Sequence, residues 1–185
     1  MDELKFAVIG NPVSHSLSPD IHLFFASQFQ LERYTYNKIK SNENDFERDI
    51  NDFFKNGGVG LNVTVPFKGL AYNLCDELDQ SAGLCKSVNT VLIDSGKLIG
   101  HSTDGQGLID DFLHKEITLE DSKILIIGAG GSAASIISSL LSHGKIKEIS
   151  ILNRTKSNAL RLLDLFETNR LLMHEEGDEY DIVIN

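Results

Sequence analysis

The feature that most constrains the fold is a glycine-rich turn in the second half of the chain. An apolar run at 123–127 (KILII) leads directly into six small residues, and an apolar, helix-like stretch follows up to His143. The six residues of the turn are Gly128, Ala129, Gly130, Gly131, Ser132 and Ala133. In a βαβ unit, the first glycine permits the tight turn, the second lets a pyrophosphate approach the backbone, and a small third residue, here Ala133, lets the helix pack on the strand. The free N–H groups at the start of the helix then favour phosphate. This order predicts a dinucleotide-binding unit, with a bare structural turn as the alternative.

The composition bounds the class of protein and its partners. Hydrophobic residues make up 41% and charged residues 24% of the 185 residues, as is typical of globular proteins. The net charge of −10 at pH 7 disfavours nonspecific binding to nucleic acid or an anionic membrane. The sequence shows no signal peptide and no transmembrane run. Cys75 and Cys85 have no His or Cys partner at metal-ligand spacing, so we expect free thiols in the cytoplasm and no metal site.

The N-terminal half alternates between strand-like and helix-like segments. We expect, in order, strand 5–9, helix 19–30, strand 33–40, helix 45–56 and strand 59–65. This order implies parallel strands with helices on the faces of the sheet. Ser18 is the expected N-cap of the first helix, followed by Pro19. Each helix carries one apolar face, made of Ile21, Phe24, Phe25 and Phe29 in the first and of Phe46, Ile50, Phe53 and Phe54 in the second.

The pattern then changes to short helices and a hairpin. We expect helices at 66–74 and 80–85, a hairpin of strands 87–93 and 97–101 that closes one side of the sheet, and a connecting helix from about Thr103 to His114. The C-terminal part is predicted to contain strands 123–127, 148–152, 171–174 and 180–184, with helices 132–143 and 157–167 between them.

Polar residues gather where the first and third strands end. Asn62 and Thr64 share one face of the third strand, and Ser14 and Ser16 follow the first strand. The carboxyl ends of parallel strands are where open α/β sheets bind ligands, and paired hydroxyls suit a carboxylate or a polyol. The alternative is ordinary turn chemistry and strand residues that face water.

Lys68 and Asp104 are the candidates for proton transfer. A lysine in the first turn of a helix opposes the helix dipole, at a cost of roughly 0.3–1 kcal/mol, which suggests a chemical reason for its place. Asp104 precedes a helix, where an aspartate is a favoured N-cap, and its functional alternative is to pair with Lys68. A surface lysine is the alternative for Lys68.

A third group of residues follows the second strand of the nucleotide unit. NAD enzymes usually carry an acidic residue there that holds the ribose hydroxyls. This chain has Asn153, Arg154 and Thr155 instead. A guanidinium suits a 2′-phosphate, so NADP(H) is favoured over NAD.

Taken together, these motifs resemble the shikimate dehydrogenase family. The resemblance extends over the whole chain, in the order GNPVSHSLSP, NVTVPFK, SVNT, STDGQG, GAGGSA, NRT and DIVIN. It implies an α/β fold, with an N-terminal mixed-sheet substrate domain (1–104), a connecting helix and linker (105–122) and a truncated Rossmann-type NADP-binding domain (123–185). It implies reduction of 3-dehydroshikimate to shikimate with NADPH, in aromatic amino acid biosynthesis.

The resemblance also implies roles for individual residues. Ser14 and Ser16 would bind the substrate carboxylate, and Lys68 with Asp104 would form the catalytic pair. The substrate hydroxyls would be held by Asn62, Thr64, Asn89 and Asp104, with Thr103 adjacent. The glycine turn, 128–133, would bind the pyrophosphate, and Asn153, Arg154 and Thr155 the adenosine 2′-phosphate.

The sequence departs from the family pattern at a few points. Asn158 stands where the family often has a second Arg, and Ser102 where it commonly has Asn. Family members also continue for about another third of a chain, so an apolar surface would be exposed here, and we expect a monomer or a homodimer that is swapped or associated through that edge. The alternatives are a catalytically impaired fragment that only binds shikimate or a nucleotide, and a quinate/shikimate dehydrogenase that uses NAD.

Overall fold

The computed structural model describes residues 3–185, and the chain forms two compact units within it. Unit 1 comprises the chain up to Ala82 together with Val88–His101. Unit 2 comprises Gly83–Ser87 and Ser102–Asn185. The limits expected for the functional domains stay a prediction, because compactness alone assigns no function.

Unit 1 is built on a mixed sheet with the strand order β2-β1-β3-β5-β6-β4. The strands are β1 (Leu4–Gly10), β2 (Tyr34–Lys40), β3 (Gly58–Val63), β4 (Glu77–Leu78), β5 (Thr90–Asp94) and β6 (Lys97–His101). β1 pairs in parallel with β2 and β3, and β5 runs antiparallel to β6, as the predicted βαβαβ order and hairpin require. β5 also pairs with β3, in an antiparallel direction. The short strand β4, parallel to β6, was not predicted.

The larger core of unit 1 lies on the face of the sheet that α2 (Phe46–Lys55) covers. Phe46, Ile50 and Phe54 of α2 are buried there, as their helical spacing predicts, and Phe53 is half-buried. Helix α3 (Lys68–Leu74) adds Ala71 to this core, and α4 (Gln80–Cys85) adds Ala82. Because this core covers one face of β1 and β3, only the opposite face of these strands is open to other groups.

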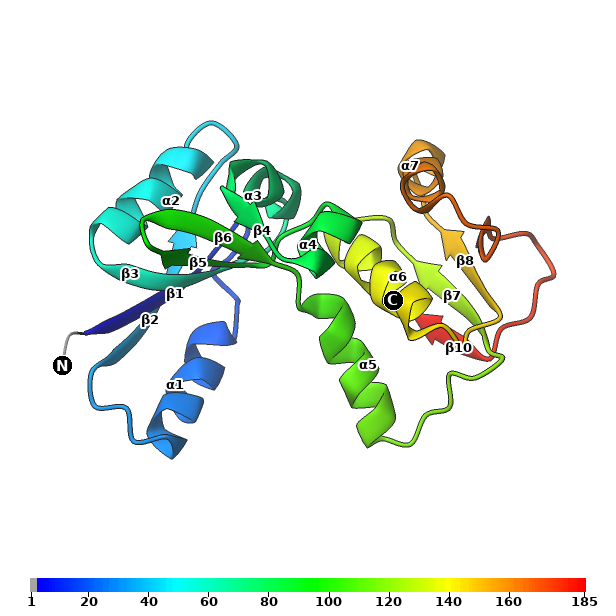
Figure 1. The fold of residues 1–185 in the computed structure, drawn as a ribbon, viewed down its shortest axis with the longest axis horizontal. Helices are drawn as coiled ribbons and strands as arrows, with labels where there is room; N and C mark the ends of the chain where they lie inside the picture. The colour runs from blue at the N-terminus through cyan, green and yellow to red at the C-terminus, as the bar shows by residue number, and fades with distance from the viewer. Residues whose placement is uncertain (1–2) are drawn as a thin grey trace. The chain divides into compact units, whose positions relative to one another are not determined.

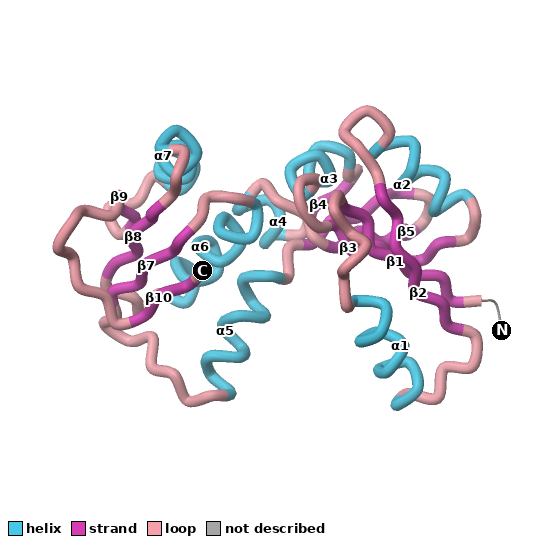
Figure 2. The backbone as a smooth tube through the Cα atoms, turned by 180° about the vertical axis from the view of Figure 1, so that it is seen from behind, coloured by secondary structure: helices cyan, strands magenta, loops and turns pink. Residues whose placement is uncertain are grey.

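Helix α1 (Ser18–Gln28) lies on that opposite side of the sheet (Figures 1 and 2). The four residues of its predicted apolar face, Ile21, Phe24, Phe25 and Phe29, are all exposed. Ala26 is the buried residue of the helix. Beneath α1, Val8 and Tyr36 of the sheet and Val13 of the loop form only a small cluster within the described residues, so little apolar surface is available to cover the helix. Ser18 lies in the first helical position rather than at the N-cap, which is Leu17.

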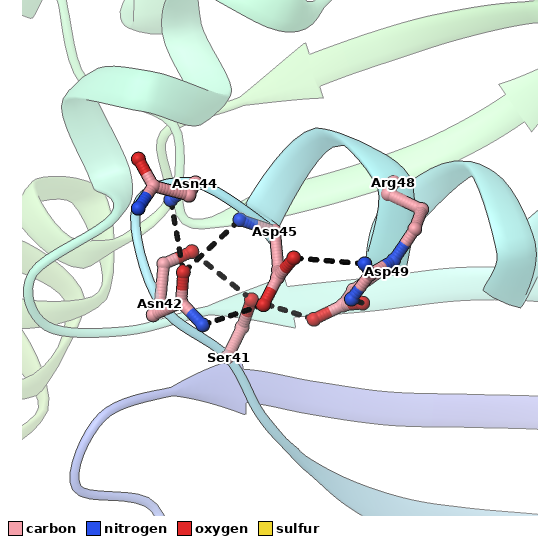
Figure 3. A network of polar contacts seen from close by, with 6 residues as sticks. All are labelled: Ser41, Asn42, Asn44, Asp45, Arg48 and Asp49. Atoms are coloured by element: carbon pink, nitrogen blue, oxygen red, sulfur yellow. Dashed lines mark hydrogen bonds and ion pairs between the residues drawn. The ribbon is translucent and has the colours of Figure 1, made fainter.

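A polar network organises the start of α2 (Figure 3). The Asn42 side-chain oxygen accepts from the backbone N–H groups of Asn44 and Asp45, and the Ser41 hydroxyl donates to Asp49 at 2.7 Å. Arg48 forms ion pairs with Asp45 and Asp49. The side chain of Asn42 thereby shapes the turn that leads from β2 into the helix.

Unit 2 contains a parallel sheet with the order β10-β7-β8-β9. Its elements are α5 (Asp104–His114), β7 (Lys123–Ile127), α6 (Gly131–His143), β8 (Glu148–Leu152), α7 (Lys156–Phe166), β9 (Leu171–Met173) and β10 (Ile182–Ile184). Ile124, Ile126, Ile149 and Ile151 of the two central strands form one core with α6 and α7. Over residues 3–185, every helix is too short or too polar to span a bilayer.

Candidate functional site

The strand register of unit 1 aligns polar residues across one face of the sheet. Val8 of β1 lies between Lys38 of β2 and Asn62 of β3, and Asn62 in turn pairs with Thr90 of β5. Residues paired in this way point to the same face. Tyr36, two residues before Lys38, shares that face, which is the one beneath α1.

Hydrogen bonds connect these side chains. The Tyr36 hydroxyl donates to Asn62 Oδ1 at 2.7 Å. Asn62 Nδ2 donates to Thr90 Oγ1 at 3.2 Å and to the backbone oxygen of Asn89 at 3.5 Å. Thr90 Oγ1 donates to Asn89 Oδ1 at 3.2 Å. Two of the predicted substrate-binding residues, Asn62 and Asn89, thus belong to one network.

The loop after β1 packs against the same network. Ser16 Oγ donates to Ser18 Oγ at 3.1 Å and accepts from the Ser18 backbone N–H at 3.2 Å. The Ser16 backbone N–H donates to the Val13 oxygen at 3.1 Å, and Val13 packs in one buried cluster with Tyr36. Burial raises the pKa of Tyr36 to about 12, an effect that the Ser18 hydroxyl partly opposes. We call these groups together the polar belt, made of Ser16, Ser18, Tyr36, Asn62, Thr90 and Asn89.

A cation lies beside the other predicted serine. Lys38 Nζ donates to the backbone oxygen of Ser14 at 2.7 Å, and both residues are exposed. The loop therefore presents the hydroxyls of Ser14 and Ser16 near an ammonium group. That combination suits a small carboxylate, which takes hydrogen bonds from hydroxyls and is attracted by positive charge.

Thr64 and Lys68 follow β3 in unit 1. The Thr64 backbone N–H donates to the Ile9 oxygen at 2.9 Å, which continues the pairing of β3 with β1 beyond the strand. Lys68 lies in the first turn of α3, as predicted, although the helix begins at Lys68 and not at Pro66, and Lys68 is half-buried. Its backbone oxygen accepts from Val88 at 3.0 Å, one residue before Asn89. Backbone pairing thus holds both ends of this segment close to the polar belt.

Thr103 and Asp104 form the start of α5 in unit 2. Thr103 is the N-cap and Asp104 the first helical residue. Buried Ser135 of α6 fixes this helix start, because its hydroxyl accepts from Ser102 Oγ at 2.8 Å and from the Gly105 backbone N–H at 3.0 Å. Asp104 therefore lies between two residues, Ser102 and Gly105, that are both hydrogen-bonded to Ser135.

The glycine turn of unit 2 has the geometry of a phosphate cradle. Gly128 has a φ of +125°, a backbone conformation that residues other than glycine rarely adopt. Gly130 is the N-cap of α6, and a Cβ added there would meet no atom within 4 Å. Ala133 is buried at the close contact of helix and strand. The turn thus leaves open space in front of the N–H groups that begin α6, and a pyrophosphate fits it.

The segment 153–155 lies at the same edge of this sheet. β8 pairs in parallel with β7, and the Gly128 backbone N–H donates to the Leu152 oxygen at 2.9 Å. Asn153 Nδ2 donates to the Thr155 oxygen at 2.8 Å, and Arg154 between them is exposed. An exposed guanidinium without an acidic neighbour in the segment fits a 2′-phosphate.

Comparison with known proteins decides the family. Sequence models described as "Shikimate dehydrogenase substrate binding domain" and "Shikimate / quinate 5-dehydrogenase" match residues 8–91 and 112–185. A shikimate dehydrogenase (NADP(+)) of Acinetobacter baumannii is 41% identical over 188 residues, which cover 98% of this chain and 71% of the relative. The chain belongs to the shikimate dehydrogenase family.

Solved structures of other proteins agree with this assignment. An Ael1 enzyme from Pseudomonas putida has a TM-score of 0.84 and 33% identity, with 98% of this chain and 68% of that chain covered. Shikimate 5-dehydrogenase from Thermus thermophilus, in complex with NADP(H) and shikimate, has a TM-score of 0.86 and 30% identity, with 97% and 67% covered. The predicted α/β fold and the predicted membership of the NADP-dependent shikimate dehydrogenases are confirmed.

Some residues that the fold brings to the site were not identified from the sequence. Ser18, Tyr36, Lys38 and Thr90 were not among the candidates. The alternation of RYTYNKIK does place Tyr36 and Lys38 on one face, but it cannot say whether that face meets the loop after β1. In the described part of the chain, His, Cys, Asp and Glu residues form no group that could hold a metal ion.

Proposed function

We propose that this chain reduces 3-dehydroshikimate to shikimate with NADPH. The observation that carries the proposal is the polar belt, in which a loop suited to a carboxylate packs beside side-chain amides suited to hydroxyls. Shikimate is a small carboxylate with several hydroxyls. The shikimate and NADP(H) bound to the Thermus thermophilus relative support the same substrate and cofactor for this chain.

We assign the residues the roles that the family motifs suggest. Ser14 and Ser16 bind the carboxylate of the substrate. Lys68 and Asp104 are the catalytic pair, and they hold and move the proton at the substrate's carbonyl oxygen. The hydroxyls are bound by Asn62, Thr64, Asn89 and Asp104, with Thr103 adjacent.

The cofactor is proposed to bind in unit 2. Gly128, Ala129, Gly130, Gly131, Ser132 and Ala133 bind its pyrophosphate, and Asn153, Arg154 and Thr155 bind its 2′-phosphate. When bound, NADPH supplies the hydride that reduces the carbonyl carbon. The open space beside Gly130 supports this assignment, because a pyrophosphate needs close access to the backbone there.

Quinate and NAD are the competing substrate and cofactor. The matching family model names quinate as well as shikimate, and Asn158, exposed in α7, offers no second cation beside Arg154. A third possibility is a binding module without turnover. We favour NADP because Asn153, Arg154 and Thr155 contain no acidic side chain for a ribose hydroxyl.

The test is oxidation of shikimate by NADP, followed by the absorbance of NADPH, with quinate and NAD as parallel assays. We expect turnover with shikimate and NADP that Lys68→Ala abolishes and that Lys55→Ala, an exposed lysine at the end of α2, leaves unchanged. Gly130→Ala should weaken NADP binding without loss of stability, because the added methyl group occupies open space.

Each failure has a distinct meaning. Shikimate binding in calorimetry without turnover would favour the binding module. Faster turnover with quinate or NAD would replace the proposed substrate or cofactor. The absence of both turnover and binding would overturn the proposed function of this chain.

We also propose a cytoplasmic location, which the two free thiols support. The chain is expected to be a monomer or a homodimer in solution. Exposed Val183 on the edge strand β10 is the apolar position at which a second copy would associate. Light scattering after size-exclusion chromatography distinguishes the two states.

A further inference from the structure

Tyr36 occupies the centre of the polar belt, although it belongs to none of the family motifs. Its side chain is 5% exposed and packs in the cluster with Val8 and Val13. The ring of His22 from α1 stacks on it, with the ring centroids 4.3 Å apart and an interplanar angle of 14°. Strand, loop and helix therefore all fix the position of the Tyr36 ring.

The fixed ring lies between two predicted parts of the substrate site. On one side its hydroxyl donates to Asn62 Oδ1 at 2.7 Å. On the other side the ring packs in one cluster with Val13, whose backbone oxygen accepts from the Ser16 N–H at 3.1 Å. One side chain thus connects the loop proposed to bind a carboxylate with the amide proposed to bind a hydroxyl.

The bond to Tyr36 also sets the orientation of the Asn62 amide. With Oδ1 held by the tyrosine, Nδ2 points to Thr90 Oγ1 and the Asn89 oxygen. Without that donor the amide keeps only these two longer bonds of its Nδ2, at 3.2 and 3.5 Å, and is held less firmly. A site whose donors and acceptors are already oriented binds more tightly, because less ordering is needed when the ligand arrives.

We propose that Tyr36 is a positioning residue that couples the carboxylate end of the shikimate site to its hydroxyl end. This inference rests on the proposed function, and it adds a residue through which Ser16 and Asn62 act together. Tyr36 does not take part in proton or hydride transfer. Its loss should weaken the binding of shikimate, while the binding of NADP, which involves unit 2, is unaffected.

The experiment compares Tyr36→Phe with Tyr34→Phe. Tyr34 lies two residues earlier on the same face of β2, and within residues 3–185 its hydroxyl makes a single long contact, at 3.4 Å with His22. Shikimate and NADP binding are measured separately by calorimetry, and steady-state kinetics give kcat and KM. We expect Tyr36→Phe to raise the Kd and KM for shikimate by about tenfold, with a smaller change in kcat. Tyr34→Phe should bind shikimate as the unchanged chain does.

A second pair of variants tests the coupling itself. Asn62→Ala and Tyr36→Phe should weaken shikimate binding by less together than the product of their separate effects, because each removes the same bond. Val13→Ala removes most of the contact between the loop and the Tyr36 ring, and it tests the proposal even where Tyr36→Phe is poorly folded, as circular dichroism would show. We expect it also to raise the Kd for shikimate.

The outcomes separate this inference from the proposed function. If the unchanged chain does not bind shikimate, both are overturned. If it binds shikimate and both Tyr36→Phe and Val13→Ala bind equally well, the proposed function stands and the role of Tyr36 is wrong. Multiplicative effects of Asn62→Ala and Tyr36→Phe would likewise reject the coupling.

Discussion

Lys38 brings a positive charge to a loop that is expected to bind an anion. Its Nζ lies 2.7 Å from the Ser14 oxygen, in a chain whose net charge is −10. The negative net charge of the protein repels a carboxylate, so a local cation is needed to attract one to this loop. Because Lys38 is exposed, its contribution should be modest and sensitive to salt.

We therefore expect Lys38→Gln to raise the Kd for shikimate by about two- to fivefold at low ionic strength, with the difference shrinking as salt is added. Lys40→Gln is the matched control, since Lys40 is exposed on the same strand two residues further on. Calorimetry at several salt concentrations measures both. An equal effect of the two variants would mean that net charge matters and the position of Lys38 does not.

The buried hydroxyl of Tyr36 should make stability depend on pH in the alkaline range. Burial raises the pKa of Tyr36 from 10.0 to about 12. The folded state therefore keeps a proton that the unfolded state loses above about pH 10. The stabilisation is complete below that pH and is lost as the pH rises towards 12. Urea unfolding should show a steeper decline over this range for the unchanged chain than for Tyr36→Phe; equal slopes would contradict the raised pKa.

At the scale of elements, periodicity and turn residues predicted most of the strands and helices, and tertiary packing decided the rest. The two-residue strand β4 has too few residues to show a pattern. Helix α1 has an apolar face in sequence, yet Phe24 is 60% and Phe29 76% exposed. Helical spacing says which side chains lie together, but it cannot say how much sheet surface is available to cover them.

The contact between α5 and α6 depends on a residue without a side chain. A Cβ at Gly105 would lie 2.2 Å from the Ser135 backbone oxygen and 2.3 Å from Ser139 Oγ. The two helices can approach here only because position 105 is glycine. The same approach allows Ser135 to hold the segment that contains Asp104.

Gly105→Ala should therefore lower the free energy of unfolding by about 1–3 kcal/mol, because backbone atoms must move apart. Gly107→Ala, in the same helix with no atom within 4 Å of the added Cβ, should instead raise it by about 0.5–1 kcal/mol through helix propensity. Urea denaturation measures both variants. Similar effects of the two substitutions would show that α5 and α6 are not in close contact.

At the scale of the whole molecule, each unit has its own apolar core. Ile50 is fully buried in unit 1 and Ile137 in unit 2. Replacing either by alanine should cost about 2–5 kcal/mol. Hydrogen exchange should accelerate mainly within the unit that carries the substitution, since its core alone is damaged. Phe29→Ala, at an exposed position, is the control and should change stability by less than about 0.5 kcal/mol. Uniform acceleration across both units would indicate a single cooperative core.

The candidate site was only partly predictable because its residues come from distant parts of the chain. Sequence motifs indicated Asn62 and Asn89, which the fold brings into one hydrogen-bond network, and Ser16, which lies in the loop packed beside it, while their roles toward a substrate stay predictions. Tyr36 left no signal, since a tyrosine in a strand is ordinary. Its importance depends on the register that sets β2 beside β1, and no local pattern specifies that register.

The polar belt also limits how chains of this kind can diverge. A lineage that replaced Tyr36 by an apolar residue would leave Asn62 Oδ1 without its donor, at a cost of about 1–3 kcal/mol. Substitutions at Tyr36, Asn62 and Thr90 should therefore be inherited together, so that hydroxyl and amide partners change as a set. Although Tyr36 and Thr90 lie 26 and 28 positions away from Asn62 in the sequence, we expect these three positions to vary together among related chains.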